Sequence, residues 1–449
     1  MTRFAPATPD DRRAMLDQLG LDSVEQLFES IPEEVRLGRP LDIPAPASEW
    51  ELLREMAALA EQNVDTGSEL SFLGAGFYSH FVPACVPWIT GRSEFQTAYT
   101  PYQAELSQGT LQSIFEYQTA ICELTGLDVA NASLYDGATA AAEACQLARA
   151  VTDRERIVVS SAVSPQARAV MRTYARAFAI DLTVVEARDG LTPVEAVRDA
   201  AADAAAVVFQ QPNFFGCLED APALSSAAAE AGALAAVSVD PISLGLLAPP
   251  GAYGAEIAFG EGQSLGNALS FGGPSFGFMA VHERHLRRLP GRLVGETVSS
   301  EGERGWVLAF QTREQHIRRE RATSNICTNQ ALNALAGVVY LSYLGPQGLR
   351  ELGVQCLSRA QAARRRLLAV GGVEEAFDAP FFKEFTLRLP RPAAEVVAAC
   401  RRRGVHPGYP AGRDYPGLDD HLVVAVTEKR SAADIERLGR AVEEALADG

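Results

Sequence analysis

Short continuous apolar runs alternate with longer alanine-rich stretches between residues 155 and 281. Five runs show this pattern: Ile157–Val159, Leu182–Val185, Ala206–Phe209, Ala235–Val239 and Ile257–Phe259. Continuous apolar strands separated by helices are typical of a mostly parallel sheet with helices on both faces. In such sheets ligands bind at the carboxyl ends of the strands. The pattern therefore predicts an α/β domain with a site at that edge.

The pattern changes on either side of this region. Residues 1–64 predict a helical arm, with helix starts at Thr8-Pro9 and Ser48. We expect a large α/β domain over 65–325, followed by linking helices and a small C-terminal α/β domain over 326–449. Three helices are expected inside the large domain, over 103–125, 138–150 and 306–321. A long helical pair, 328–344 and 347–370, is expected to be interrupted at Gly345-Pro346.

Residues 71–108 follow neither a helical nor a strand period. Glycine, proline and aromatic residues alternate there with small polar residues. One interpretation is a long surface loop. The other is a segment that lines a site or an interface, because functional residues concentrate on loops held by a rigid scaffold. The density of aromatic residues favours the second interpretation.

Composition excludes several classes of function. The net charge of −17 argues against a surface that binds nucleic acid, which needs clustered Lys and Arg. The sequence contains no stretch of ~20 apolar residues, so we expect no membrane span. The N-terminus lacks the apolar segment of a signal peptide. The seven cysteines are scattered without metal-ligand spacing, which indicates reduced thiols in a cytoplasmic protein. His80 and Cys85 are only a weak metal candidate, so we expect no metal.

Two short motifs lie where a ligand is expected. Asp136-Gly137-Ala138-Thr139 precedes an alanine-rich helix, whose free amides and dipole favour an anion such as phosphate. The alternative interpretation is that Asp136 is only the N-cap of this helix and that Gly137 only forms a tight turn. Asp240 follows the strand 235–239 and is either the partner of a pyridinium nitrogen or the cap of the turn before Pro241.

Residues 255–281 read AEIAFGEGQSLGNALSFGGPSFGFMAV, a strand, a glycine-rich loop and a second strand. This stretch resembles the segment that holds the reactive lysine in pyridoxal-phosphate (PLP) enzymes of the aminotransferase-like class. Here the loop offers carboxylate, amide and hydroxyl groups but no amine that could tether the cofactor. The chain contains only two lysines, Lys383 and Lys429, which we expect to be surface charges. The stretch predicts a cofactor-enzyme architecture without its covalent anchor.

Several extended motifs, in order along nearly the whole chain, point to one family. They are FLGAGFYSHFVPACV, YTPYQAELSQGTLQSIFEYQT, YDGATAAAEA, GEGQSLGNALSFGGPSFGFMA and RATSNICTNQALNAL. These segments resemble the amino-terminal half of the glycine cleavage system P-protein, a glycine dehydrogenase (decarboxylating) that some organisms split into two subunits. The resemblance implies a PLP-dependent transferase (aminotransferase-like) fold with a helical arm and a small C-terminal domain.

The resemblance also implies a division of labour between two similar subunits in an α2β2 assembly. Subunit 2 carries PLP on its lysine, and this chain, subunit 1, is inactive alone and has no catalytic residue of its own. Together they decarboxylate glycine and pass the aminomethyl group to the lipoyl arm of the H-protein. Gly137, Ala138, Thr139 and Asp240 are then remnants of a cofactor pocket.

The loop 71–103 is then explained as a wall of the partner's active site. We expect Tyr99, Thr100, Tyr102 and Gln103 to face the neighbouring PLP, or alternatively only to pack the interface. Gly272-Gly273 either allows close approach to the partner's ligand or forms a plain turn. Two other functions stay open: a self-sufficient PLP-dependent aminotransferase or lyase, against which the missing lysine argues, and a non-catalytic scaffold.

Overall fold

The computed structural model describes residues 6–96, 99–322 and 324–448, and the chain divides into two units, Met1–Val64 and Asp65–Gly449. The first unit is an arm whose described residues are all at least partly exposed. Its two α-helices are α1 (Pro9–Leu19) and α2 (Glu49–Ala60). Thr8 and Ser48 cap them with capping boxes, so local hydrogen bonds define both helix starts.

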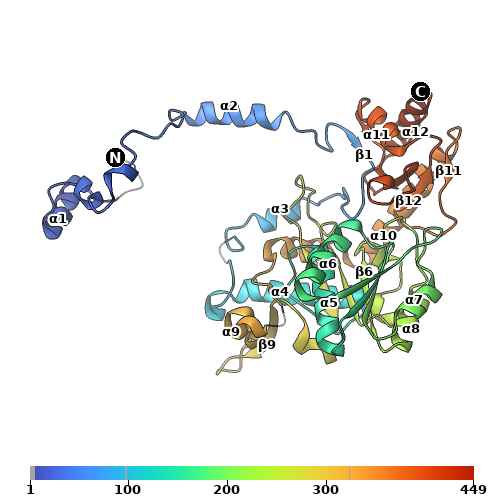
Figure 1. Cartoon of the computed structure of the whole chain (residues 1–449), viewed down its shortest axis with the longest axis horizontal. Coiled ribbons are helices and arrows are strands. Elements are labelled where there is room, and N and C mark those ends of the chain that lie inside the picture. Colours follow the sequence, from blue (N-terminus) through green and yellow to red (C-terminus); the bar gives the residue numbers. More distant parts are fainter. Residues whose placement is uncertain (1–5, 97–98, 323, 449) are drawn as a thin grey trace. The chain divides into compact units, whose positions relative to one another are not determined.

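A seven-stranded sheet forms the centre of the second unit (Figure 1), in the order β2-β8-β7-β6-β5-β3-β4. The strands are β2 (Val129–Ala130), β3 (Arg156–Ser160), β4 (Asp181–Val185), β5 (Ala204–Gln211), β6 (Leu234–Val239), β7 (Ile257–Glu261) and β8 (Gly277–Val281). Strands β3 to β7 are parallel, and β8 runs antiparallel to both of its neighbours. The structure confirms the mostly parallel sheet and all five predicted strands.

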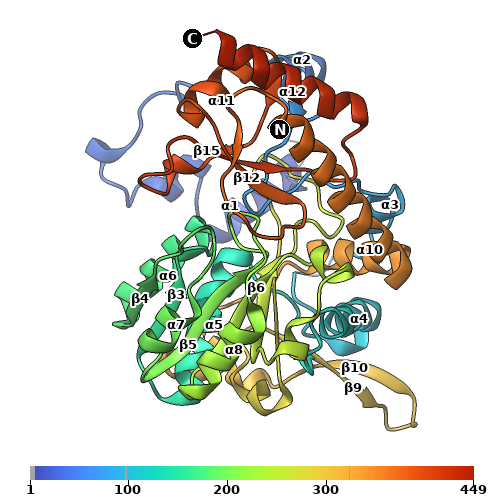
Figure 2. The ribbon, with the colours of Figure 1, turned by 90° about the vertical axis from the view of Figure 1, so that its right-hand side faces the viewer.

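Helices cover both faces of this sheet (Figure 2). Alternate residues of β3 separate the two cores: Ile157 and Val159 pack in the cluster that includes α5 and α6, whereas Val158 packs in the cluster of the opposite face. The helices are α4 (Gln108–Thr125), α5 (Gly137–Thr152), α6 (Pro165–Phe178), α7 (Val194–Ala200), α8 (Ala221–Glu230) and α10 (Ala331–Leu368). The alternation explains why each strand is apolar throughout.

A smaller antiparallel sheet, β11-β12-β15-β14, lies in the C-terminal part of the second unit. Its elements are β11 (Glu374–Glu375), β12 (Glu384–Arg388), α11 (Ala393–Arg401), β14 (Tyr409–Pro410), β15 (His421–Ala425) and α12 (Ala432–Ala447). Strand β13 (Val405–His406) pairs instead with β1 (Leu70–Ser71). Helix α10 is interrupted at Gly345, where φ is 61°, as the Gly345-Pro346 pair predicts.

Two predicted helices differ from the structure. The single helix expected over 306–321 is wrong: Arg304–Ala309 forms β10, which pairs with β9 (Leu293–Val298). The rest of that range forms only the short helix α9 (Gln315–Arg318) and 3₁₀ turns at Gln311–Arg313 and Arg319–Arg321. Cross-strand pairing overrides the local pattern there. Helix α4 begins at Gln108 rather than 103, after a single 3₁₀ turn at Ala104–Leu106. Within the described residues, no helix has both the length and the apolar character needed to cross a membrane.

Candidate functional site

A cavity lies at the carboxyl ends of β5, β6 and β7. The residues that line it include Tyr78, Asp136, Gly137, Gln210, Asp240 and Glu261. The cavity measures only about 70 Å³, whereas a groove between α4 and α10 measures about 530 Å³. Ligand pockets are usually roughly 300–1,000 Å³. The edge of the sheet at which a ligand is expected therefore leaves little room for one.

The N-terminus of α5 forms one side of the cavity. Asp136 is its N-cap and accepts a hydrogen bond from Thr139 N at 2.7 Å, while Gly137 N donates to Glu261 Oε2 at 2.9 Å. A Cβ at Gly137 would lie 2.7 Å from Glu261 N, so this close approach requires glycine. Burial raises the pKa of Glu261 to about 7. The amides that resemble a phosphate cradle thus bind two carboxylates of the chain itself.

Lys383 lies on the other side, directly before β12, and its side chain is buried. Its Nζ is 2.8 Å from Asp240 Oδ2 and 3.1 Å from His80 Nε2, and it lies 3.5 Å from the ring centroid of Tyr78. The expectation that Lys383 is a surface charge is therefore wrong, because a carboxylate, an imidazole nitrogen and an aromatic face surround its ammonium. Lys429 is exposed, as expected.

Asp240 caps the turn after β6, which is one of the two roles that the sequence left open, and its other oxygen pairs with a cation of the chain itself. Its Oδ1 accepts a hydrogen bond from Ile242 N at 3.2 Å, which caps the turn after β6. Its Oδ2 faces a cation, but the cation is the ammonium of Lys383 rather than a pyridinium. The negative charge of Asp240 is consequently balanced within the chain.

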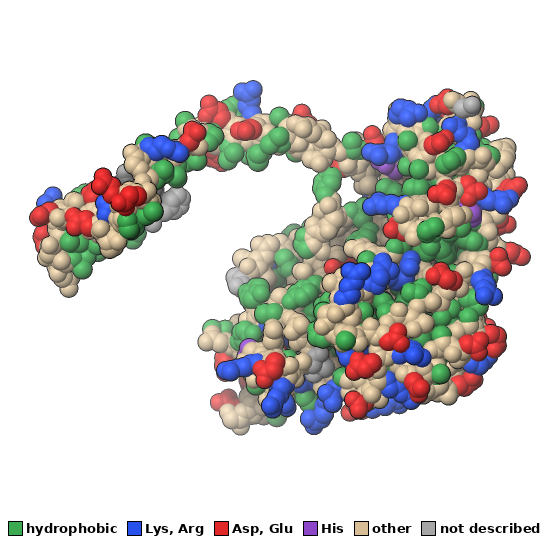
Figure 3. All heavy atoms as spheres, viewed as in Figure 1, with side chains coloured by type: hydrophobic (Ala, Val, Ile, Leu, Met, Phe, Trp, Pro, Cys, Tyr) green, Lys and Arg blue, Asp and Glu red, His purple; other side chains and the backbone are tan. Residues whose placement is uncertain are grey.

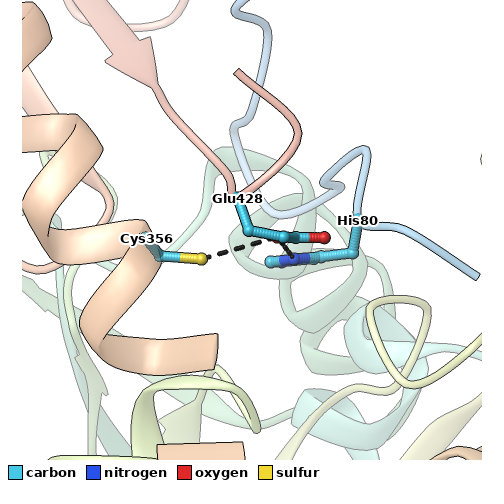
Figure 4. Close-up of side chains that lie close together, drawn as sticks. All are labelled: His80, Cys356 and Glu428. Carbon is cyan, nitrogen blue, oxygen red and sulfur yellow. Dashed lines mark hydrogen bonds and ion pairs between the residues drawn. The ribbon is translucent and has the colours of Figure 1, made fainter. Parts of the chain in front are cut away.

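A buried chain of polar side chains continues from Lys383. An ammonium has no acceptor, so His80 Nε2 accepts from Lys383, and His80 Nδ1 carries the proton that it donates to Glu428 Oε2 at 2.7 Å. Burial and the nearby ammonium lower the pKa of His80, which keeps the ring neutral. Cys356 Sγ, on α10, lies 3.6 Å from Glu428 Oε2 (Figure 4). This series of polar side chains connects three parts of the fold: the region of the small sheet, the loop before α3 (Cys85–Thr90) and α10.

His80, Cys356 and Glu428 are also the types of residue that bind metal, and their ligand atoms lie within 4.8 Å of one another. Two observations argue against a metal there. The imidazole already donates to Glu428 and faces an ammonium, so neither ring nitrogen is free for an ion. Burial raises the pKa of the Cys356 thiol to about 12, which disfavours the thiolate that a metal requires. The three residues fit a hydrogen-bond chain.

The pocket does not fit PLP. The loop between β7 and β8 contains no amine, as the sequence shows. Glu261 binds the first amide of α5, where a phosphate would be held. Lys383 neutralises Asp240, the candidate partner for the pyridinium nitrogen. All three requirements for binding the cofactor are therefore unmet in this chain.

The other predicted site residues lie outside this cavity. Tyr99 and Gln103 are exposed, and Thr100 is partly buried. Tyr102 is half exposed and accepts a hydrogen bond from Nη2 of the buried Arg292 at 3.1 Å, while the guanidinium lies 5.5 Å from its ring centroid. No local motif marks Arg292, so sequence reasoning missed it.

Gly272 and Gly273 form part of an exposed turn between β7 and β8. Their φ values are 112° and 125°, in the left-handed region that favours glycine. A Cβ at Gly272 would meet no atom of this chain within 4 Å, among the described residues. Backbone conformation, rather than close packing within the chain, is what requires glycine at this turn.

Known proteins resemble the chain over its full length. A profile of the glycine cleavage system P-protein family matches residues 2–442. A probable glycine dehydrogenase (decarboxylating) subunit 1 from Moorella thermoacetica is 49% identical, over 99% of this chain and 100% of that protein. The corresponding protein from Carboxydothermus hydrogenoformans is 50% identical, over 97% of this chain and 98% of that protein.

Solved structures agree. A crystal structure of glycine decarboxylase (P-protein) of the glycine cleavage system, in inhibitor-bound form, has a TM-score of 0.91 and 46% identity, covering 99% of this chain and 100% of that one. Lactobacillus brevis glutamate decarboxylase is only 13% identical but shares the fold, with a TM-score of 0.67 over 94% of this chain and 97% of that one. The PLP-dependent transferase fold is thus confirmed, and the chain belongs to the glycine cleavage system P-protein family.

Proposed function

We propose that this chain is the lysine-free subunit of a two-chain glycine dehydrogenase (decarboxylating). Its partner, subunit 2, holds PLP through a lysine, and the pair forms an α2β2 assembly. The complex decarboxylates glycine and transfers the remaining aminomethyl group to the lipoyl arm of the H-protein. When bound in the partner, PLP supplies the electron sink for the loss of CO2.

One observation carries this proposal: the chain has the PLP-transferase fold, yet its β7–β8 loop has no amine to tether the cofactor. The amine beside the pocket, that of Lys383, is paired with Asp240, and Glu261 accepts a hydrogen bond from the first amide of α5. A self-sufficient aminotransferase or lyase needs a tethering amine. The division between a lysine-bearing and a lysine-free subunit explains why the fold is kept while the pocket is closed.

This chain contributes a wall to the partner's active site. We assign that role to Tyr99, Thr100, Tyr102 and Gln103, and to the turn at Gly272-Gly273. Tyr99 is 77% exposed, and such exposure of a large aromatic side chain is typical of an interface residue. The contact from Arg292 holds the Tyr102 hydroxyl in place, so it is the best placed of these groups to position glycine or the lipoyl arm.

The arm supports an obligate partner. Helix α2 exposes Trp50, Leu52, Leu53, Met56 and Leu59. Apolar side chains alternate with charged ones along the arm (Figure 3). An exposed apolar surface of this extent marks a protein–protein contact. We assign the arm to a contact with the lysine-bearing subunit. All seven cysteines are free thiols, which supports a cytoplasmic complex.

Reconstitution tests the proposal. This chain, a lysine-bearing homologue and lipoylated H-protein are purified separately, and exchange of labelled CO2 into the carboxyl group of glycine is measured. Exchange is expected only when both chains are present. Exchange by this chain alone would support a self-sufficient enzyme, and full exchange without it would leave only a scaffold role.

A further inference from the structure

We infer that Glu261 and Lys383 replace the two charged ends of the cofactor, and that removing them converts the cavity into a non-covalent site for a phosphorylated pyridine. This inference deepens the proposed function, in which PLP belongs to the partner, because it names the residues that keep PLP out of this chain.

Glu261 takes the place of the cofactor's anionic end at the N-terminus of α5. A helix N-terminus binds phosphate because its first amides lack intrahelical acceptors and its dipole favours negative charge. In this chain Gly137 N donates to Glu261 Oε2, and Thr139 N donates to Asp136 Oδ1. Glu261 is fixed from its other side by Gln263 N, which donates to Oε1 at 3.0 Å. A phosphate would have to displace Glu261 and would then face like charge from Asp136.

Lys383 takes the place of the cofactor's cationic end beside Asp240. A carboxylate at this strand end can stabilise a protonated pyridine only if its negative charge is not already balanced. Lys383 balances it at 2.8 Å, and His80 and Tyr78 hold the ammonium in place from two other directions. Lys383 directly precedes β12 of the small sheet, whereas Asp240 directly follows β6 of the large sheet. A cation from another part of the fold, the ammonium of Lys383, therefore takes the place that a pyridinium would have beside Asp240.

The small volume of the cavity and the charges of Glu261 and Lys383 both oppose binding of a phosphorylated pyridine. Asp240 and Glu261 both line the cavity, which is too small for a pyridine ring and a phosphate as it stands. Glu261→Ala removes a side chain that fills the anion site and uncovers the Gly137 amide. Lys383→Ala leaves Asp240 without its ion pair, so a bound pyridinium would restore the balance of charge.

Equilibrium dialysis with pyridoxine 5′-phosphate tests the inference, because this compound has the ring and the phosphate but no aldehyde to react with amines. The full-length wild-type chain is compared with Glu261→Ala, Lys383→Ala and the double variant. The exposed Glu123→Ala and Lys429→Ala are the matched controls. Wild type and controls are expected to show no saturable binding. Glu261→Ala should show saturable binding, and the double variant should bind at least about 10-fold more tightly than Glu261→Ala.

Inorganic phosphate separates the two ends, because it lacks the ring. Glu261→Ala should gain phosphate binding, whereas Lys383→Ala should not. If Lys383→Ala does not fold, the phosphate result with Glu261→Ala decides, and Glu261→Gln, which keeps the volume and removes the charge, should bind phosphate less tightly than Glu261→Ala. Saturable binding to wild type, or a folded Glu261→Ala that binds neither ligand, would overturn the inference. An inactive reconstituted pair would contradict the proposed function but leave these dialysis results unchanged.

Discussion

Lys383 Nζ lies 2.8 Å from Asp240 Oδ2, and this contact ties the start of β12 to the end of β6. In PLP-dependent enzymes an acidic residue stabilises the protonated ring of the cofactor. Here Asp240 holds two parts of the chain together. A group suited to binding a ligand has become part of the internal support of the fold.

Lys383→Ala is expected to lower the free energy of unfolding by about 3–5 kcal/mol, because it leaves the Asp240 carboxylate buried and unpaired. Urea denaturation of the full chain measures this. Lys429→Ala, at the chain's other lysine, should change stability by no more than about 0.5 kcal/mol. The double variant Lys383→Ala with Asp240→Ala should be less destabilised than the sum of the two single variants. Equal effects at both lysines would contradict the ion pair.

Reductive labelling should distinguish the same two lysines. PLP followed by borohydride modifies accessible amines, so peptide mass spectrometry should find the label on Lys429 and not on Lys383 in the native chain. In urea both should be labelled. Labelling of native Lys383 at the level of Lys429 would show that its ammonium is not enclosed, and would reopen a covalent role for it.

Glu261→Gln should change how stability depends on pH. The folded-state pKa of Glu261, about 7, lies above its ordinary value of 4.5. Between these values the folded chain keeps a proton that the unfolded chain has lost, so this contribution to stability falls as the pH rises through that window. Glu261→Gln has no carboxyl group at this position, so it lacks this pH-dependent contribution to stability. Its stability relative to wild type should therefore rise from pH 4.5 to 7, by up to about 3 kcal/mol.

Unfolding free energies from urea titrations across that pH range provide the measurement. Glu123→Gln, at an exposed glutamate of α4, is the control and should keep a constant difference from wild type. A constant difference for Glu261→Gln as well would mean that this carboxyl group is not held in a buried, desolvated position.

Local patterns in the sequence predicted most of the fold and little of the site. Continuous apolar runs are a local signal, so they predicted the five parallel strands of the seven-stranded sheet, and Gly345-Pro346 predicted the break in α10. Lys383 was misjudged because its partners, His80 and Asp240, are far away in the sequence, and an isolated lysine looks like a surface charge. The Asp136 motif was found, but nothing local shows that Glu261 binds the amide beside it.

Tyr102→Phe tests the assigned wall of the partner's active site. The change removes the hydroxyl that accepts from Arg292 and keeps the ring. In the reconstituted pair we expect glycine exchange to fall at least about 10-fold, since a hydrogen bond that involves a charged group contributes about 1.5–3 kcal/mol. Tyr174→Phe, on α6, is the matched control. Unchanged exchange in Tyr102→Phe would leave this residue with a packing role only.

Deletion of residues 1–64 should separate folding from assembly. The hydrophobic clusters begin at Leu70, so the remaining unit should keep its helix content and show a cooperative thermal transition. It should, however, fail to co-purify with the lysine-bearing subunit. Circular dichroism and affinity co-purification measure the two properties. Retained co-purification would show that the arm is not needed for the pair.

The apolar arm also has a consequence for the living cell. In the proposed assembly, chains made in excess of their companion would leave Trp50 and its apolar neighbours on α2 uncovered by that companion. Such unassembled subunits would be degraded or would aggregate. In the proposed assembly, balanced synthesis of the two polypeptides would therefore limit the loss of unassembled subunits.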